Sequence, residues 1–319
     1  MILLGVDIGG TKIAAGVVDG DTGAVLHCER TPTQAHEGGA AVLARAITLA
    51  RTVVDAVNVP IDAVGIGAGG QIDYRTGVVL SATDILPGWA GVRLTEAFAA
   101  AFGVSAFADN DVNAFALGEH RFGAGRGATD AVYLALGTGV GGAIVTRGEL
   151  HRGKRGTGGE LGHMQMFWDS SAAADTLESL TCGTALADTY NEAARSFNAR
   201  NHKPVVSAKS AIEVGGAAQQ GDAAALSAVR TLGESLGVGL ASLANILDTE
   251  RFVIGGGLLG LGDLLLNPAR ETFAQYVLPL YRDTVIVAAG LGRDSAVVGA
   301  ACVALAGLER APMERNTIV

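Results

Sequence analysis

The residues best suited to chemistry lie together in one stretch, Ala106–Glu119, which reads AFADNDVNAFALGE. An apolar run typical of a strand ends there in Asp109, Asn110 and Asp111, and an Ala/Leu-rich helix begins almost at once. Polar side chains at the carboxyl end of a strand are typical of ligand recognition in open α/β sheets. A carboxylate in that place can accept a proton from a substrate hydroxyl. We therefore interpret Asp111 as a catalytic base, and Asp109 and Asn113 as structural residues that cap the following helix.

Two glycine-rich loops flank this stretch: residues 7–12 (DIGGTK) precede it and residues 137–142 (GTGVGG) follow it. Glycines let backbone N–H groups approach phosphate oxygens closely. An ordinary tight hairpin would explain either loop alone, but two such loops and the glycine turn at 255–257 favour a nucleotide site. The predicted phosphate contacts are Gly9, Gly10, Thr11, Lys12, Gly137, Thr138 and Gly139. Asp7, at the end of the first strand, is predicted to orient a hydrated Mg²⁺.

A further cluster, residues 158–163 (GGELGH), is followed by Glu178. A Glu and a His three residues apart, after glycines, present acceptor and donor groups that suit sugar hydroxyls. For His163 alone a structural histidine is the alternative. Its neighbour Glu160 and the surrounding glycines favour a ligand contact.

The elements that must position these residues follow an α/β pattern with short strands that end in glycine turns. The predicted strands are Ile2–Asp7, Lys12–Val18, Ala24–Cys28, Ala63–Ala68, Val132–Leu136, Ala143–Val145, Arg251–Ile254 and Val285–Ala288. The predicted helical stretches are Gly39–Val57, Val92–Phe102, Glu178–Asp248 and Ala296–Leu308, with a frayed tail from about Glu309. The order strand, glycine loop, strand, turn occurs twice, about 130 residues apart. This internal repeat predicts two similar lobes that share a cleft.

Composition limits the class of protein. The chain has 319 residues, and a length of this order corresponds to about two domains. A net charge of −9 argues against a nucleic-acid surface, and no apolar run is long enough to span a membrane. The N-terminus lacks a basic region, and three scattered cysteines make neither a disulfide framework nor a metal cluster. We expect a cytoplasmic protein without nucleic-acid or membrane partners.

The motifs, taken together, resemble the ROK family (repressors, open reading frames, kinases), and within it the glucokinase-like sugar kinases. The motifs in question are LGVDIGGTK, PGW, DNDVNAFALGE, LGTGVGG, GGELGHM, LESLTCGTAL and VIGGG, in the family's order over essentially the whole chain. The resemblance implies an α/β, actin/hexokinase-like (ribonuclease H-like) fold, duplicated in two lobes with an interdomain cleft. It implies a small lobe of residues 1–109 plus 297–319, with a returning C-terminal helix, and a large lobe of residues 110–296.

The resemblance also implies roles for single residues. Asp111 is expected to activate the sugar hydroxyl, and Asn110 to hold neighbouring hydroxyls. Further sugar contacts are expected at Gly70, in a loop that closes over the sugar, and at Glu160, His163 and Glu178. Gly256 and Gly257 are expected to contact adenosine, and the two glycine loops to hold phosphates. The implied reaction is Mg²⁺-dependent transfer of the γ-phosphoryl group of ATP to a hexose hydroxyl, the 6-OH, by a homodimer or homotetramer.

Alternatives remain open within and beyond this reading. An amino sugar or a sugar-like cyclitol is the alternative acceptor, and polyphosphate is the alternative donor. The family also contains sugar-sensing repressors, which carry a DNA-binding helix-turn-helix ahead of the first glycine loop. Only six residues precede Asp7 here, and the chain is acidic, so we expect no such regulator.

One departure from the family pattern concerns zinc. The family usually holds zinc with the histidine at the position of His163 and three cysteines of a CxCGxxGC segment. Residues 167–176 here read FWDSSAAADT, without a cysteine. One histidine with scattered carboxylates is not the ligand set of a tetrahedral structural zinc site. Glucose specificity, which that zinc helps to fix, is therefore open.

We predict that the purified protein contains no stoichiometric zinc. Elemental analysis after exhaustive dialysis should find zinc well below one ion per chain, and chelator should leave the unfolding temperature unchanged. One tightly bound zinc per chain would contradict this prediction.

Overall fold

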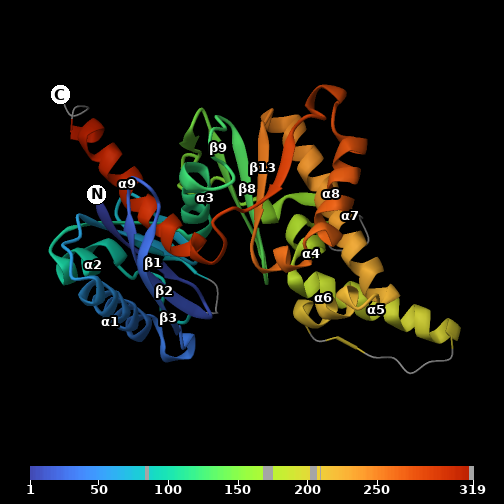
Figure 1. The fold of residues 1–319 in the computed structure, drawn as a ribbon, viewed down its shortest axis with the longest axis horizontal. Helices are drawn as coiled ribbons and strands as arrows, with labels where there is room; N and C mark the ends of the chain where they lie inside the picture. Colours follow the sequence, from blue (N-terminus) through green and yellow to red (C-terminus); the bar gives the residue numbers. More distant parts are fainter. Residues whose placement is uncertain (83–85, 168–174, 202–206, 209, 316–319) are drawn as a thin grey trace. The chain divides into compact units, whose positions relative to one another are not determined.

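The computed structural model describes residues 1–82, 86–167, 175–201, 207–208 and 210–315, and the chain divides into two compact units. The first unit contains Met1–Gly127, Leu150–Gly158 and Ala289–Val319, and the second contains Ala128–Glu149 and Gly159–Ala288. Each unit is built on its own five-stranded sheet (Figure 1). In the described parts of the chain, no helix combines the length and apolarity needed to cross a bilayer.

The two sheets have the same topology. The order is β3-β2-β1-β4-β7 in the first unit and β10-β9-β8-β13-β14 in the second. In each, an antiparallel hairpin (β1–β2, β8–β9) is followed by two parallel neighbours (β4 and β7, β13 and β14). The first sheet's strands are β1 (Ile2–Ile8), β2 (Lys12–Asp19), β3 (Val25–Pro32), β4 (Ala63–Ala68) and β7 (Ser105–Asn110). The second sheet's strands are β8 (Ala131–Leu136), β9 (Val140–Thr146), β10 (Glu149–Leu150), β13 (Arg251–Gly255) and β14 (Val285–Ala288). The internal repeat predicted from the sequence is confirmed.

Helices cover the sheets because their apolar faces match the buried faces of the strands. In the first unit, α1 (Gly39–Val57) and α2 (Leu94–Phe102) share a hydrophobic core with one face of the sheet. The helices α3 (Asp111–Phe122) and α9 (Ser295–Arg315) lie on the other face. In the second unit, one core joins the sheet to α4 (Leu177–Thr181), α5 (Gly183–Asn201), α6 (Ala211–Gln219), α7 (Ala223–Leu247) and α8 (Asp263–Tyr276).

Smaller elements complete the units. Two hairpins pair β5 (Gln71–Asp73) with β6 (Val78–Ser81), and β11 (Gln165–Phe167) with β12 (Asp175–Thr176). The short 3₁₀ helices are η1 (Ala35–Glu37), η2 (Leu161–His163), η3 (Gly257–Leu261), η4 (Pro279–Tyr281) and η5 (Gly292–Asp294).

Most predicted elements are confirmed, and three boundaries are wrong by more than two residues. β3 continues past Cys28 to Pro32. β3 is the edge strand of its sheet, and an edge strand can include a proline. β9 begins at Val140, so the second half of the 137–142 loop is strand. α9 continues through the predicted frayed tail to Arg315, and Glu309 in that stretch forms a 2.9 Å ion pair with Arg121 on α3.

The lobe boundaries inferred from the sequence, after residue 109 and before residue 297, stay a prediction. Compactness divides the chain differently: α3 and residues 150–158 belong to the first unit. A reason is the close packing of α3 on α9, where a Cβ built on Gly118 would lie 2.8 Å from the Cα of Gly299.

The end of α3 is fastened by a buried carboxylate. Glu119 is 0% exposed, and its Oε2 accepts hydrogen bonds from the N–H groups of Ala124 and Gly290, both at 2.8 Å. Its Oε1 accepts a third from Leu291 at 3.0 Å. A buried charge is tolerated because backbone donors replace its water. The carboxylate ties α3 to the segment that enters α9.

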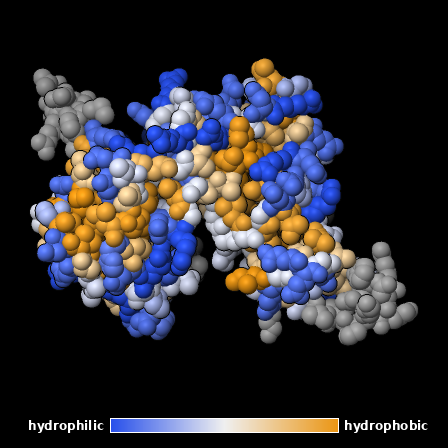
Figure 2. Space-filling model, viewed as in Figure 1, coloured by the Kyte–Doolittle hydropathy of each residue, from blue (hydrophilic) through white to orange (hydrophobic). Residues whose placement is uncertain are grey.

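The surface of the second unit is mixed in character, with hydrophobic residues between hydrophilic ones in the view of Figure 2. Its most exposed large apolar side chains include Ile246 near the end of α7 and Tyr276, Leu278 and Leu280 at and after the end of α8. These four are 53–80% exposed.

Two strand glycines let α9 lie directly on the first sheet. A Cβ on Gly5 of β1 would overlap the carbonyl oxygen of Val297 and lie 2.9 Å from the nitrogen of Ala301. A Cβ on Gly65 of β4 would overlap the carbonyl oxygen of Ala300 and lie 2.8 Å from the nitrogen of Ala304. Helix backbone cannot yield as a side chain can, so both positions require glycine.

We predict that Gly65→Ala lowers the free energy of unfolding by about 3 kcal/mol or more, because α9 must lift from the sheet. Gly216→Ala is the matched control: it lies within α6 with open space at its Cβ, so it should be neutral or stabilising by about 0.5–1 kcal/mol. Thermal and urea unfolding measure both variants. Equal midpoints for Gly65→Ala and wild type would contradict the packing described.

Candidate active site

The site in the first unit is assembled where three parallel strands end. Gly67 of β4 pairs in register with Asp7 of β1 on one side and with Asp109 of β7 on the other. One residue further on, Ala68 pairs with Ile8 and with Asn110. Because parallel strands end at the same edge of a sheet, this register brings together Asp7, the 69–70 loop and the Asn110–Asp111 pair.

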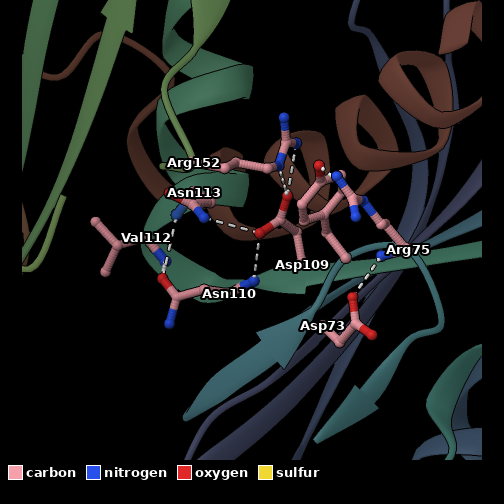
Figure 3. A network of polar contacts seen from close by, with 8 residues as sticks. Asp73, Arg75, Asp109, Asn110, Val112, Asn113 and Arg152 are labelled. Atoms are coloured by element: carbon pink, nitrogen blue, oxygen red, sulfur yellow. Dashed lines mark hydrogen bonds and ion pairs between the residues drawn. The ribbon is translucent and has the colours of Figure 1, made fainter. Parts of the chain in front are cut away.

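Asn110 begins α3 as its N-cap. Its Oδ1 accepts hydrogen bonds from the N–H groups of Val112 at 2.9 Å and Asn113 at 3.3 Å (Figure 3). Its Nδ2 donates to the carbonyl oxygen of Gly70 at 3.0 Å. An amide nitrogen has two N–H donors, so the Asn110 side chain can offer one more hydrogen bond to a ligand. Asp111 follows as the first residue of α3, where the helix dipole stabilises negative charge.

Asp109 is held by four hydrogen bonds behind this pair (Figure 3). Its Oδ1 accepts from Asn113 Nδ2 and from the N–H of Asn110, both at 2.8 Å. Its Oδ2 accepts from Arg152 Nε at 3.0 Å and from Arg152 Nη2 at 2.7 Å. Asp109 and Asn113 hydrogen-bond to each other, but the prediction that they cap the helix is wrong, because Asn110 is the N-cap of α3. Arg152 had no predicted role, and nothing in the basic HRGKRG run around it distinguishes it from its neighbours.

The 69–70 loop is fixed from three sides. Gly69 donates its N–H to the carbonyl oxygen of Ile8 at 3.1 Å, and its own carbonyl accepts from the indole Nε1 of buried Trp89 at 3.1 Å. Gly70 has φ +100°, and a Cβ there would lie 2.5 Å from the carbonyl oxygen of Ser81. Position 70 therefore requires glycine, both because a side chain would clash with Ser81 and because the backbone has a positive φ. Trp89 belongs to the PGW motif, whose supporting role the sequence did not reveal.

Asp7 and Asp111 face the same small space. A Cβ built on Gly67 would lie 3.8 Å from Asp7 Oδ1 and 3.7 Å from Asp111 Cα. Burial and, after it, the negative charge of Asp111 raise the pKa of Asp7 to about 7, although Lys12 and Arg30 act in the opposite direction. A divalent cation beside Asp7 would relieve this repulsion, so the donor chemistry fits magnesium.

The first glycine loop is a tight turn held by a buried threonine. Gly9 donates its N–H to the carbonyl oxygen of Lys12 at 3.1 Å. Thr33, which is 0% exposed, donates its hydroxyl to Gly9 at 2.6 Å and its N–H to Thr11 at 3.0 Å. Thr11 and Lys12 are exposed. Thr33 is a supporting residue that the sequence did not reveal.

The second glycine loop lies in the second unit and is fixed by Glu178. The Oε2 of Glu178 accepts from the N–H of Val140 at 2.8 Å, and a Cβ on Gly139 would lie 2.6 Å from that oxygen. Gly183, at the start of α5, donates its N–H to the carbonyl oxygen of Gly137 at 2.7 Å. Glu178, which the sequence predicted as a sugar contact, therefore also fixes by a hydrogen bond the loop predicted to bind phosphate.

The remaining predicted residues are also in the second unit. Glu160 and His163 have exposed side chains, with His163 Nδ1 3.9 Å from Glu160 Oε2. Gly256 has φ +89°, and a Cβ there would overlap the backbone of Leu136, whereas Gly257 begins η3. No group of three or more His, Cys, Asp or Glu side chains that could hold a metal occurs in the described ranges. Residues 168–174, in the segment that lacks the zinc cysteines, lie outside those ranges.

The family of the chain follows from comparison with known proteins. The family model of the ROK family matches residues 3–306, so the chain belongs to the ROK family. Its fold is the actin/hexokinase-like, two-domain α/β fold of the ROK glucokinases, as the sequence predicted.

Among its relatives are glucokinases from two bacteria. The glucokinase of Thermotoga maritima is 34% identical over 309 residues, covering 94% of this chain and 96% of the relative. That of Streptomyces coelicolor is 35% identical over 313 residues, with the same coverage of 94% and 96%. A ROK glucokinase from Streptomyces griseus, solved in complex with glucose and AMPPNP, has a TM-score of 0.81 and 32% identity, covering 96% of this chain and 100% of that chain.

We predict that Asp7→Asn stabilises the metal-free protein. The folded-state pKa of Asp7, about 7, lies above its ordinary value of 3.8. The stability associated with the bound proton is complete below the ordinary value and is lost as pH rises towards 7 and above. Asparagine avoids that loss. With chelator present, Asp7→Asn should be more stable than wild type at pH 8, on the order of 2–4 kcal/mol, and the difference should shrink by pH 5.

Thermal unfolding of both proteins from pH 4 to 8 is the measurement. A variant that is no more stable than wild type at pH 8 would contradict the burial of Asp7 and its repulsion from Asp111 as the causes of its raised pKa.

Proposed function

We propose that this chain is an ATP-dependent, glucokinase-like sugar kinase that transfers the γ-phosphoryl group to a hexose hydroxyl, the 6-OH. The observation that carries the proposal is the strand-end arrangement of the first unit. A carboxylate at a helix N-terminus, Asp111, adjoins an amide with a spare donor and faces a second carboxylate, Asp7. Membership of the ROK family and the glucokinase relatives support the same reaction.

In this proposal Asp111 is the general base. Phosphoryl transfer is mostly a matter of positioning and charge stabilisation, with a base that takes the proton of the attacking hydroxyl. Asn110 would donate its remaining N–H to a neighbouring hydroxyl, and the loop at Gly70 would cover the sugar. Glu160, His163 and Glu178 are the further sugar contacts that we propose on the second unit.

The glycine loops are proposed to hold the nucleotide. Gly9, Gly10, Thr11 and Lys12 would bind phosphate oxygens on the first unit. On the second unit, Gly137, Thr138 and Gly139 would bind phosphates and Gly256 and Gly257 adenosine. Asp7 would hold magnesium through water, and the ion would supply charge neutralisation on the phosphates when bound. The structure of the Streptomyces griseus relative with AMPPNP supports ATP as the donor.

We further propose that the protein works in the cytoplasm as a homodimer or homotetramer. An amino sugar or a cyclitol as acceptor is the second candidate, because the cysteines of the usual zinc segment are absent from residues 167–176. A sugar-sensing regulator is a weaker candidate, since the net charge of −9 is unsuited to a DNA surface.

We predict that Asp111→Asn lowers kcat with Mg·ATP and glucose by about 10²–10⁴, the usual contribution of a general base. The KM for glucose should change little, because binding does not need the proton transfer. Asp55→Asn, an exposed carboxylate on α1, is the matched control and should have wild-type activity. Coupled ADP release measures all three proteins, and wild-type turnover in Asp111→Asn would exclude this residue as the base.

The acceptor and donor are tested with one panel. It contains glucose, mannose, fructose, glucosamine, N-acetylmannosamine, 3-amino-3-deoxyglucose and a C7 cyclitol, each with ATP and with polyphosphate. Asp111-dependent turnover that is fastest on glucose supports the proposal. Turnover confined to an amino sugar or cyclitol would replace the acceptor. No turnover on any member, with ATP binding intact, would contradict a kinase.

A further inference from the structure

The segment of residues 150–158 has a particular place in the chain. It packs in the first unit, whereas residues 149 and 159, on either side of it, belong to the second. Its continuation carries Glu160 and His163. Arg152 is the residue of this segment that forms an ion pair with the strand end of the first unit. Its side chain is 11% exposed and that of its partner Asp109 is 2% exposed, so the pair is shielded from water.

We propose that Arg152 is a positioning residue for the catalytic pair Asn110–Asp111, acting through Asp109. The proposal rests on the proposed function of Asp111 as the base. Both guanidinium contacts reach one oxygen of Asp109, Oδ2, which leaves Oδ1 to accept from Asn113 Nδ2 and from the N–H of Asn110 (Figure 3). The charge on Arg152 therefore fixes the carboxylate that orients the backbone of Asn110 and the side chain of Asn113.

Tyr74 limits the freedom of Arg152 from the other side. The Cζ of Arg152 lies 4.6 Å from the centroid of the Tyr74 ring, a distance typical of a cation–π contact. Tyr74 follows β5, which begins directly after the loop at Gly70. Arg152 thus contacts Asp109, the residue before the Asn110–Asp111 pair, and Tyr74, the residue after β5.

The consequence for catalysis is one of geometry rather than binding. Without Arg152, Asp109 keeps its backbone and amide donors but loses the cation with which it forms an ion pair, and the turn before Asp111 is held less firmly. A misplacement of about 1 Å at reacting groups costs roughly 100-fold in rate. Substrate binding depends on many more contacts, so the effect should be concentrated in kcat.

The test uses Arg152→Gln and Arg152→Lys, with Arg155→Gln as the matched control. Arg155 is an exposed arginine of the same segment. Arg152→Gln should lower kcat on the best acceptor about 10–100-fold, with the KM values for sugar and ATP within about threefold of wild type. Arg152→Lys should recover part of the loss, because lysine restores the charge but not the planar guanidinium. Arg155→Gln should match wild type.

A double-mutant cycle with Asp109→Asn tests the route. If Arg152 acts through Asp109, the double variant Asp109→Asn/Arg152→Gln is no slower than the slower single variant. If the loss of kcat in the double variant equals the product of the two single losses, the proposal is overturned. A kcat for Arg152→Gln within about twofold of wild type would also overturn it. If Arg152→Gln does not fold, Arg152→Lys carries the same cycle.

A second readout separates this inference from the proposed function. Hydrogen exchange without substrate should be faster in Arg152→Gln than in wild type or Arg155→Gln for the amides of Val112 and Asn113, which donate to Asn110. If the wild type phosphorylates no sugar, the proposed function fails while this exchange difference still supports the positioning role. Unchanged exchange at 112–113 overturns that role whether or not the enzyme is active.

Discussion

The first unit depends on the parallel register of β1, β4 and β7 around a residue without a side chain. Gly67 stands between Asp7 and Asp109 in that register, and a Cβ there would lie 3.0 Å from the Cβ of Ala114 on α3. Glycine at this point lets α3 begin close to the strand ends. It thereby allows Asp7 and Asp111 to interact, and the cost is that burial and the neighbouring charge hold the pKa of Asp7 near 7.

The polar groups around these strand ends can be buried because each one has a hydrogen-bond or ion-pair partner. Asp109 has Arg152 and Asn113, Asn110 has the first turn of α3 and Gly70, and Gly69 has Trp89. The bonds of Asp109 with Arg152, of Asn110 with Gly70 and of Gly69 with Trp89 join parts of the chain that are distant in sequence, so each also fixes a loop. In the second unit Glu178 does the same for the loop at Gly139. Two of the residues proposed to meet the sugar, Asn110 and Glu178, thus also fasten neighbouring loops.

Sequence reasoning predicted what is local. The period of apolar residues predicted α1 at its observed bounds, and the repeated hairpins predicted two similar lobes, which the structure shows as two sheets of one topology. It missed Arg152, Thr33 and Trp89, because their partners lie 43, 24 and 20 residues away and no local pattern marks them. It also missed α8, which contains Pro268, a residue that normally ends a helix.

The central claim is that Asp111 accepts the proton of the sugar hydroxyl that is phosphorylated. The most direct measurement is a crystal structure of this protein with glucose and AMPPNP. The account predicts a carboxylate oxygen of Asp111 within about 2.6–3.2 Å of the 6-hydroxyl oxygen, the reach of a general base. A sugar bound with that hydroxyl out of reach of Asp111, and another group in its place, would contradict the account.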